Sequence, residues 1–251
     1  MRPAPTAMGF IDLHCHLLPG VDDGALDLDD SVAMARVAVK EGFEAICATP
    51  HIRHDHDVRI GEIAGRVAAL DEELERREIP LRVLTGGEVA ETAVAGLTDA
   101  ELRAVALGGG RWILLEPRAG PLSDTLDAAV AQLGARGFHA LLAHPERHLA
   151  EDLFPRLERL IAAGALVQAT AAFFERQPTA DGMLALARRG LVHVLSSDAH
   201  SSHGGRPVAL GGALDALAGV ELVAPHLDWI AHTAPAAIVA GEVPLPPYAP
   251  G

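Results

Sequence analysis

Short apolar runs alternate with segments of helical periodicity along almost the whole chain. The runs that predict β-strands lie at residues 10–14, 44–49, 81–86, 111–116, 139–144, 165–170 and 191–198. Apolar residues recur at helical spacing between them, at residues 28–42, 60–78, 122–137, 153–163, 179–189 and 206–218. Strands that alternate with helices favour parallel strands with right-handed crossovers. Seven such repeats predict an α/β barrel rather than an open sheet.

The pattern shows no internal boundary, so we predict one barrel domain over residues 9–242. In this interpretation residues 1–8 form a short extension before the first strand, and the proline-rich segment 243–251 forms an extended tail. The chain has 251 residues, and 49% of them are hydrophobic, which suffices for a single large core.

Composition narrows the expected partners and compartment. The formal net charge of −14 would repel nucleic acid and anionic membranes, so neither is expected as a partner. No apolar run reaches membrane-spanning length, and the N-terminus lacks a signal-peptide pattern, which predicts a cytoplasmic protein without membrane insertion. Cys15 and Cys47, the two cysteines, lie in strand-like runs and form no disulfide framework, as suits a reducing compartment. Nothing in the sequence indicates an oligomeric state.

Residue types that bind metals gather where the predicted strands end. His14 and His16 are two positions apart, so on a strand both imidazoles point to the same side. The ends of later strands add His51, Glu88, Glu116, His144, Asp198 and His200. In barrels of parallel strands the chemistry collects at this rim. A metal centre built from histidines and carboxylates is therefore predicted there.

Some of these residues have a plainer interpretation. His51 could be a solvated loop histidine, and Glu88 could be a charge in the first turn of a helix. Asp22 and Asp23 could be turn formers, and Asp23 becomes a ligand candidate only through the other residues. Glu116 and His144 are harder to explain in this way, because they follow runs too apolar to face solvent and buried charges need a partner.

Two other chemistries fit less well. Residues 47–53 match the C-x5-R pattern of thiol phosphatases, but Pro50 removes one phosphate-binding amide and Cys47 lies in a predicted buried strand. Amidohydrolase-type barrels also open with H-x-H and often bridge their metals with a carbamylated lysine on a strand. The one lysine of this chain, Lys40, lies on the first predicted helix, so that bridge cannot form here.

Taken in order, the motifs resemble the polymerase-and-histidinol-phosphatase (PHP) superfamily, and within it the manganese-dependent bacterial tyrosine phosphatases of the capsule-biosynthesis type. The resemblance rests on DLHCHLLPGVDDGA, ATPHI, GGEV, LLEP, AHPER, SSDAH and GRP, which span nearly the whole chain. It implies a distorted (β/α)7 barrel with three divalent ions, manganese ahead of iron or zinc, at the C-terminal rim of the strands. The implied ligands are His14, His16, Glu88 and Asp198 for one ion, Glu88, Glu116 and His144 for a second, and Asp23, His51 and His200 for a third.

The same resemblance implies hydrolysis of phosphotyrosine in a protein. Hydroxide formed from water by the ions would attack phosphorus, while Arg147 and Arg206 neutralise the equatorial oxygens and His200 is a candidate proton donor. A bacterial tyrosine kinase of exopolysaccharide or capsule synthesis is the expected protein substrate.

Three alternatives to this function stay open. The main one is a small-molecule phosphatase, such as a histidinol phosphatase, which shares the metal set and differs at the rim. A DNA-editing exonuclease is disfavoured by the acidic charge, and a non-catalytic kinase-binding regulator by the intact ligand set.

Overall fold

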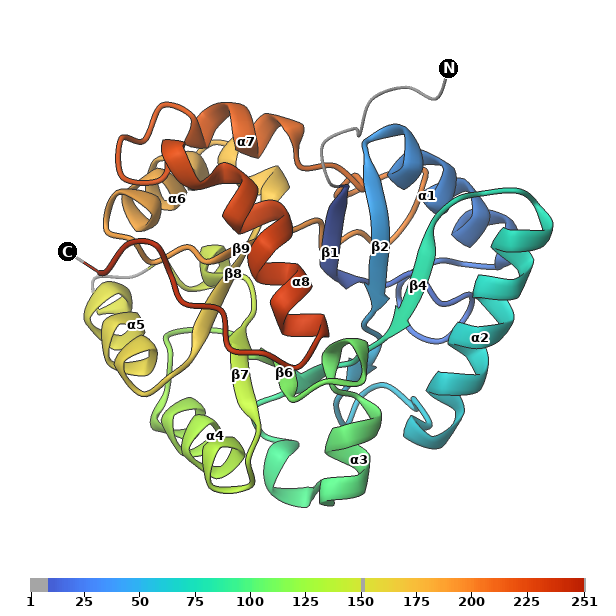
Figure 1. The fold of residues 1–251 in the computed structure, drawn as a ribbon. Coiled ribbons are helices and arrows are strands. Elements are labelled where there is room, and N and C mark those ends of the chain that lie inside the picture. Colours follow the sequence, from blue (N-terminus) through green and yellow to red (C-terminus); the bar gives the residue numbers. More distant parts are fainter. Residues whose placement is uncertain (1–8, 150–151, 251) are drawn as a thin grey trace.

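The computed structural model describes residues 9–149 and 152–250, as parallel strands surrounded by helices (Figure 1). The predicted extension, residues 1–8, lies outside the described residues. The strands form two parallel sheets, in the orders β1-β2-β4 and β3-β5-β6-β7-β8-β9. Their bounds are β1 Phe10–Cys15, β2 Phe43–Ala48, β3 His51–Ile52, β4 Arg82–Thr85, β5 Glu88–Ala90, β6 Trp112–Glu116, β7 His139–Leu142, β8 Leu166–Thr170 and β9 Val194–Ser196.

Two of the predicted strands are interrupted, and each continues in the other sheet. β2 leads into β3 across Pro50, which has no N–H group for a strand ladder. β4 leads into β5 across two glycines, and a Cβ on Gly87 would lie only 2.9 Å from Val105 Cβ. Only a residue without a side chain permits this approach. The first residues beyond the two breaks, His51 and Glu88, are register partners.

The last strand returns beside the first. A parallel bridge joins Cys15 to Ala199, and the Asp198 N–H donates to the His14 carbonyl over 2.8 Å. Asp12, buried in β1, accepts hydrogen bonds from the N–H and hydroxyl of Ser197. The first and last strands therefore lie side by side. The predicted fold class, a parallel α/β fold of the distorted-barrel type, is confirmed.

All of the predicted helices form, with one shortened. The described residues contain α1 Leu28–Lys40, α2 Ile60–Arg76, α3 Asp99–Ala104, α4 Asp124–Ala135, α5 Leu153–Ala162, α6 Thr179–Arg188, α7 Gly211–Leu217 and α8 Ala234–Val239. The helix predicted from about residue 206 begins only at Gly211, and Arg206 lies in the preceding loop, where it donates to Asp198. The prediction also missed α3 and α8, although a capping box of Thr98 and Glu101 marks the start of α3.

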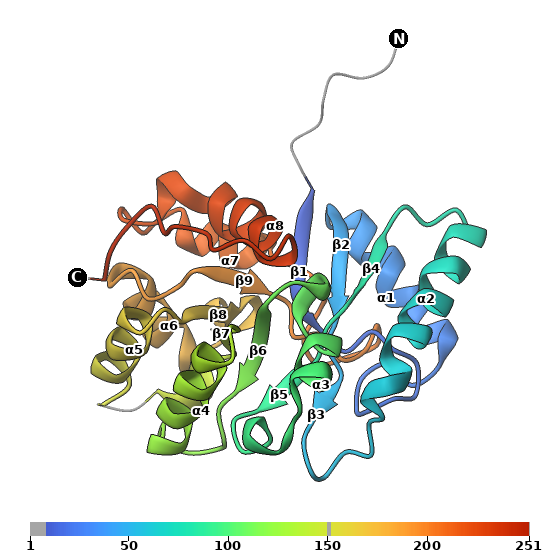
Figure 2. The ribbon, with the colours of Figure 1, turned by 60° about the horizontal axis from the view of Figure 1, so that its bottom comes forward.

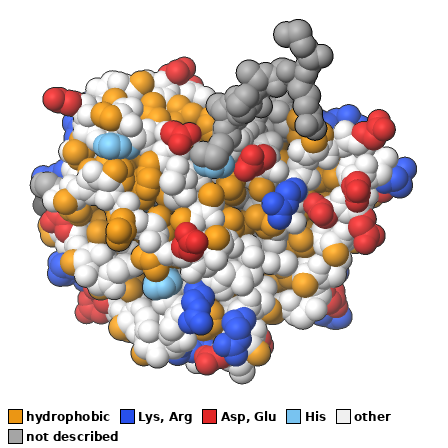
Figure 3. Space-filling view, in the orientation of Figure 1, with side chains coloured by type: hydrophobic (Ala, Val, Ile, Leu, Met, Phe, Trp, Pro, Cys, Tyr) orange, Lys and Arg blue, Asp and Glu red, His pale blue; other side chains and the backbone are white. Residues whose placement is uncertain are grey.

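The two ends of the barrel differ in chemistry. Ile238 of α8 packs in one apolar cluster with residues inside the strands, such as Leu13 and Leu114, and so covers the N-terminal end of the strands. On this face hydrophobic and charged side chains are interspersed (Figure 3). Figure 2 shows β3 and β5 at the end of the molecule opposite α8. His51 and Glu88, the first residues of these two strands, lie at that end. No helix among the described residues combines the length and apolar content needed to cross a bilayer.

Candidate metal centre

Four side chains from three distant parts of the chain converge at the C-terminal end of β1. The Nε2 atoms of His14 and His16 lie 3.3 Å apart. Oε2 of Glu88, at the start of β5, lies 3.4 and 3.3 Å from these two atoms. Oδ1 of Asp198, just after β9, lies 3.3 and 3.7 Å from them. All four residues are buried; the donor atoms of His14, His16 and Asp198 lie close enough together to hold one ion, and Glu88 adjoins both imidazoles.

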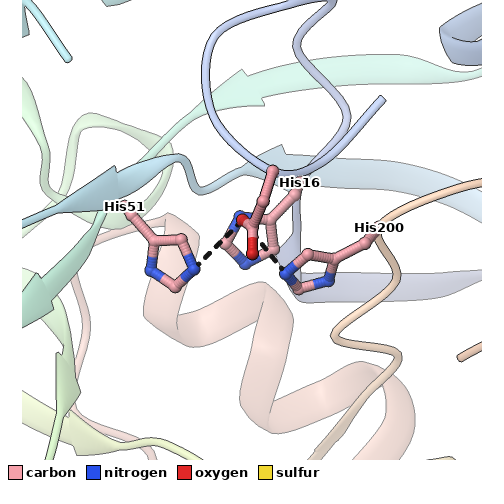
Figure 4. A group of neighbouring side chains, drawn as sticks. His16, His51 and His200 are labelled. Atoms are coloured by element: carbon pink, nitrogen blue, oxygen red, sulfur yellow. Dashed lines mark ion pairs between the residues drawn. The ribbon is translucent and has the colours of Figure 1, made fainter. Parts of the chain in front are cut away.

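A second group lies nearer to solvent and shares His16. Oδ1 of Asp23 lies 3.3 Å from His51 Nε2 and 3.5 Å from His200 Nε2. The rings of His16, His51 and His200 lie close together (Figure 4), and those of His16 and His200 stack with centroids 3.9 Å apart. The Asp23 side chain is 57% exposed, so this group forms the outer edge of the site. The structure thus places Asp23 beside His51 and His200, the two residues with which the sequence resemblance groups it.

The remaining two predicted ligands extend the cluster on the other side of Glu88. Oε1 of Glu88 accepts a hydrogen bond of 2.7 Å from His144 Nε2. Oε2 of Glu88 and Oε2 of Glu116 lie 2.8 and 3.9 Å from His51 Nδ1. Glu88 therefore faces every part of the cluster, with one oxygen toward His144 and the other toward His14, His16 and His51.

Three polar side chains outside the predicted ligand set hold or adjoin these residues. Gln168 of β8 lies 3.0 Å from His14 Nδ1, and Asp22 lies 2.8 Å from His16 Nδ1, so each imidazole presents its Nε2 to the centre. The sequence alone offers Asp22 only as a turn former, and the structure gives it this contact with His16. A polar residue inside the apolar run ALVQAT is a signal that could have identified Gln168, because a buried amide needs partners. Arg53, the third, donates to both oxygens of Glu116 at 3.1 and 3.3 Å.

Several donor atoms in the cluster lack hydrogen-bond partners among the residues that the structure describes, and divalent cations would satisfy them. Glu88 Oε2 and His51 Nδ1 are buried without a hydrogen-bond partner, although they lie only 2.8 Å apart. An unpaired buried carboxylate oxygen is costly unless a cation neutralises it. Mixed imidazole and carboxylate donors suit manganese, iron or zinc. The residues present therefore fit a cluster of such ions.

Protonation in the cluster differs from one imidazole to the next. Burial lowers the pKa of His16, but the hydrogen bond to Asp22 and the nearby negative charge of Glu88 outweigh it and raise the pKa to about 10. Burial lowers the pKa values of His144 and His200 to about 4. These two rings are neutral at neutral pH, which is the form that binds a metal.

Two predicted phosphate-binding arginines lie at the edge of the cluster. Arg147 donates from Nη2 to Asp198 at 3.1 Å, and its Nη1 lies 3.6 Å from Glu116. Arg206 donates from Nη2 to the other Asp198 oxygen at 3.1 Å. The Arg147 and Arg206 side chains are 37% and 20% exposed, so both guanidinium groups reach the metal centre and solvent.

The thiol and lysine alternatives find no support in this geometry. Cys47 is fully buried in β2, where burial raises the pKa of its thiol to about 12. A thiol in this state is a poor nucleophile. Lys40 is the last residue of α1, on a helix rather than on a strand.

Comparison with known proteins places the chain in a family. Residues 10–219 match the family model described as capsular polysaccharide synthesis, CpsB/CapC. The chain belongs to the CpsB/CapC family. This CpsB/CapC chain is 36% identical over 200 residues to tyrosine-protein phosphatase YwqE of Bacillus subtilis, covering 76% of this chain and 78% of that one. It is 27% identical to the putative tyrosine-protein phosphatase CapC of Staphylococcus aureus, over 76% of this chain and 77% of that one.

The family resemblance extends to the fold. A crystal structure from a study of YwqE from Bacillus subtilis and CpsB from Streptococcus pneumoniae superposes on this CpsB/CapC chain with a TM-score of 0.81. The two chains are 28% identical, and the match covers 96% of this chain and 99% of that one. The proteins of that study are described as unique metal-dependent tyrosine phosphatases.

Proposed function

We propose that this chain is a metal-dependent phosphatase that hydrolyses phosphotyrosine in proteins. The observation that carries the proposal is that the predicted ligands form one connected cluster, with Glu88 at its centre, Asp23 and His200 at its outer edge, and Arg147 and Arg206 beside Asp198. Membership of the CpsB/CapC family supports the substrate class, since relatives at 36% and 27% identity bear the name tyrosine-protein phosphatase.

Three divalent ions, with manganese expected, would share the cluster. Proximity supports His14, His16, Glu88 and Asp198 for one ion and Asp23, His51 and His200 for another. Glu88, Glu116 and His144 are proposed for the remaining ion. His51 lies close enough to Glu88 and Glu116 to approach that position too.

When bound, such ions supply water that is acidic enough to react near neutral pH and positive charge for the phosphoryl oxygens. The side chains of this protein would bind and orient the phosphoryl group. Arg147 and Arg206 now lie on carboxylates that the ions would neutralise, so their N–H groups are placed to bind the equatorial oxygens of the phosphoryl group. The low pKa of His200 favours a neutral ligand over a proton donor. A phenolate needs little assistance to leave, which suits tyrosine phosphate.

The expected protein substrate is a bacterial tyrosine kinase of exopolysaccharide or capsule synthesis, in keeping with the family description, and the chain is expected to act in the cytoplasm. A histidinol phosphatase would use similar metal ligands and differ at the rim. We therefore test both substrates, and DNA, with one preparation.

The test compares hydrolysis of a phosphotyrosine peptide, histidinol phosphate and single-stranded DNA by the same manganese-loaded protein. We expect the peptide to be hydrolysed with the highest kcat/KM and the activity to be lost in chelator and restored by Mn²⁺. Cys47→Ser should stay active. Preference for histidinol phosphate would contradict the substrate proposal, and a folded, metal-binding but inactive Cys47→Ser protein would contradict the metal mechanism.

A further inference from the structure

Asp30, which is outside the proposed metal and phosphate ligands, joins two loops that carry them. It lies in the first turn of α1 and is only 6% exposed. Its Oδ1 accepts hydrogen bonds from the backbone N–H of Ser202 at 2.9 Å and from the Ser202 hydroxyl at 2.5 Å. Its Oδ2 accepts from the N–H of Leu26 at 3.2 Å. One buried carboxylate thus holds two backbone segments that are far apart in sequence.

Both segments lead directly to the outer part of the candidate metal centre. Leu26 follows Asp23 in the loop between β1 and α1, and Ser202 follows His200 in the loop between β9 and α7. Asp23 and His200 face each other across 3.5 Å. Because Asp30 is hydrogen-bonded to both loops, it restrains the distance between Asp23 and His200 without contacting either proposed ligand.

The loop between β9 and α7 needs such an anchor. Between Ser202 and Arg206 it contains Gly204 and Gly205, and Gly205 has a φ of +79°. Glycines leave a free backbone many conformations, and fixing them costs free energy. Beside the glycines, Arg206 donates to Asp198 and the Gly205 carbonyl accepts from Arg176, and the chain next enters the core at Val208.

We propose that Asp30 is a positioning residue that clamps the Arg206 loop to the Asp23 loop, and so holds Arg206 and His200 in place for a phosphorylated substrate. The inference rests on the proposed phosphatase function for its catalytic consequence. Its structural part, the clamp between the two loops, is independent of the substrate.

The chain offers a closely matched control in the adjacent residue. Asp29 has the same charge and lies in the same helical turn, but its side chain is 90% exposed and its one ion pair, to Arg77, spans 3.8 Å. We expect Asp30→Ala to lower kcat/KM for a phosphotyrosine peptide by about 10- to 100-fold, the size of effect that a displacement near 1 Å produces. Asp29→Ala should stay within twofold of the wild type.

Conservative and double variants separate the clamp from a general loss of stability. Asp30→Asn keeps an oxygen for Ser202 and should recover part of the activity, and Ser202→Ala, which keeps its backbone N–H, should lose less than Asp30→Ala. If Asp30 acts through Arg206, the combined Asp30→Ala and Arg206→Ala protein should be little worse than Arg206→Ala alone. Fully multiplicative losses would overturn the positioning role.

Two further readouts do not depend on activity. Hydrogen exchange in Asp30→Ala should rise in residues 22–27 and 200–206 and stay unchanged in β6 and β7. Manganese titration should show weaker binding of one ion per chain, as in His51→Ala, with the others unaffected. Unchanged exchange in both loops, or a rise spread over the whole protein, would overturn the clamp. If the wild type failed to hydrolyse phosphotyrosine, the proposed function would fall, while exchange and titration would still test the clamp.

Discussion

At the scale of single residues, Glu88 is the centre of the candidate site. It is fully buried, and its two oxygens face imidazoles from β1, β3 and the end of β7. Three of the cluster's imidazoles lie within 3.4 Å of Oε2, yet that oxygen accepts no hydrogen bond. A carboxylate in this position can serve two ions at once, whereas each imidazole nitrogen serves one.

The bridging position of Glu88 predicts how metal content responds to mutation. Glu88→Ala should lose more manganese than His51→Ala, because in the proposed three-ion cluster it would remove the ligand shared by two ions. Elemental analysis of the purified proteins measures this. Glu91→Gln is the matched control, since Glu91 is also buried but its carboxylate accepts from Ser123 outside the cluster, and it should keep the full metal content. Equal losses in the Glu88 and His51 variants would remove the bridging assignment.

Arg147 allows phosphate recognition to be separated from metal binding. In Arg147→Ala, kcat should fall by about 10- to 1000-fold if the guanidinium stabilises charge in the transition state, while metal content stays unchanged. Arg147→Lys should recover only part of the loss, because an ammonium lacks the forked geometry. Arg66→Ala, at an exposed position of α2, serves as the control. Kinetics close to wild type in a fully metallated Arg147→Ala protein would leave phosphate to Arg206 and the ions.

At the scale of elements, the two broken strands position the site. Hydrophobic periodicity predicted the strands at 44–49 and 81–86, but it could not predict that each resumes in another sheet after Pro50 and Gly87. Those breaks depend on contacts with distant residues, such as Val105 against Gly87, which no local pattern contains. Motif order was sufficient to name the histidines and carboxylates that the structure brings together, whereas Asp22 and Gln168, which contact His16 and His14, depend on the folded geometry.

Gly87 therefore supports a prediction about folding and metal binding together. Gly87→Ala should lower the free energy of unfolding by about 1–3 kcal/mol, because its Cβ would overlap Val105 and Ile52. Metal content should fall as well, since Glu88 is the next residue. Gly65→Ala in α2, where a Cβ meets nothing within 4 Å, should instead raise the stability by up to about 1 kcal/mol. Urea unfolding measures both, and an unchanged stability of Gly87→Ala would show that the break tolerates a side chain.

At the scale of the whole molecule, the candidate metal centre and the packing of the C-terminal segment lie at opposite ends of the strands. The polar cluster lies at the C-terminal end of the strands, and α8 with the C-terminal segment covers the other end. Tyr248 is buried there against His226 and Trp229, and its hydroxyl donates to the Val192 carbonyl. Val192 precedes β9, whereas Asp198 follows it, so this contact is one strand length from the metal centre.

This separation predicts that Tyr248→Phe affects stability and leaves activity alone. Loss of the hydrogen bond should cost about 1 kcal/mol and lower Tm by about 2–4 °C in a protein of this size. The kcat of the manganese-loaded variant should equal that of the wild type. Calorimetry and peptide hydrolysis test the two parts, and a fall in kcat with no change in Tm would contradict the separation.

The burial of the Tyr248 hydroxyl also determines whether a tyrosine kinase can phosphorylate this protein. The sequence contains a single tyrosine, and in the folded chain its hydroxyl is occupied by a backbone carbonyl. A tyrosine kinase incubated with the native protein would find no acceptor on it, so any radiolabelled phosphate on tyrosine would have to be on the kinase or another substrate. Label on this chain would then act as a reporter of unfolding at its C-terminal end.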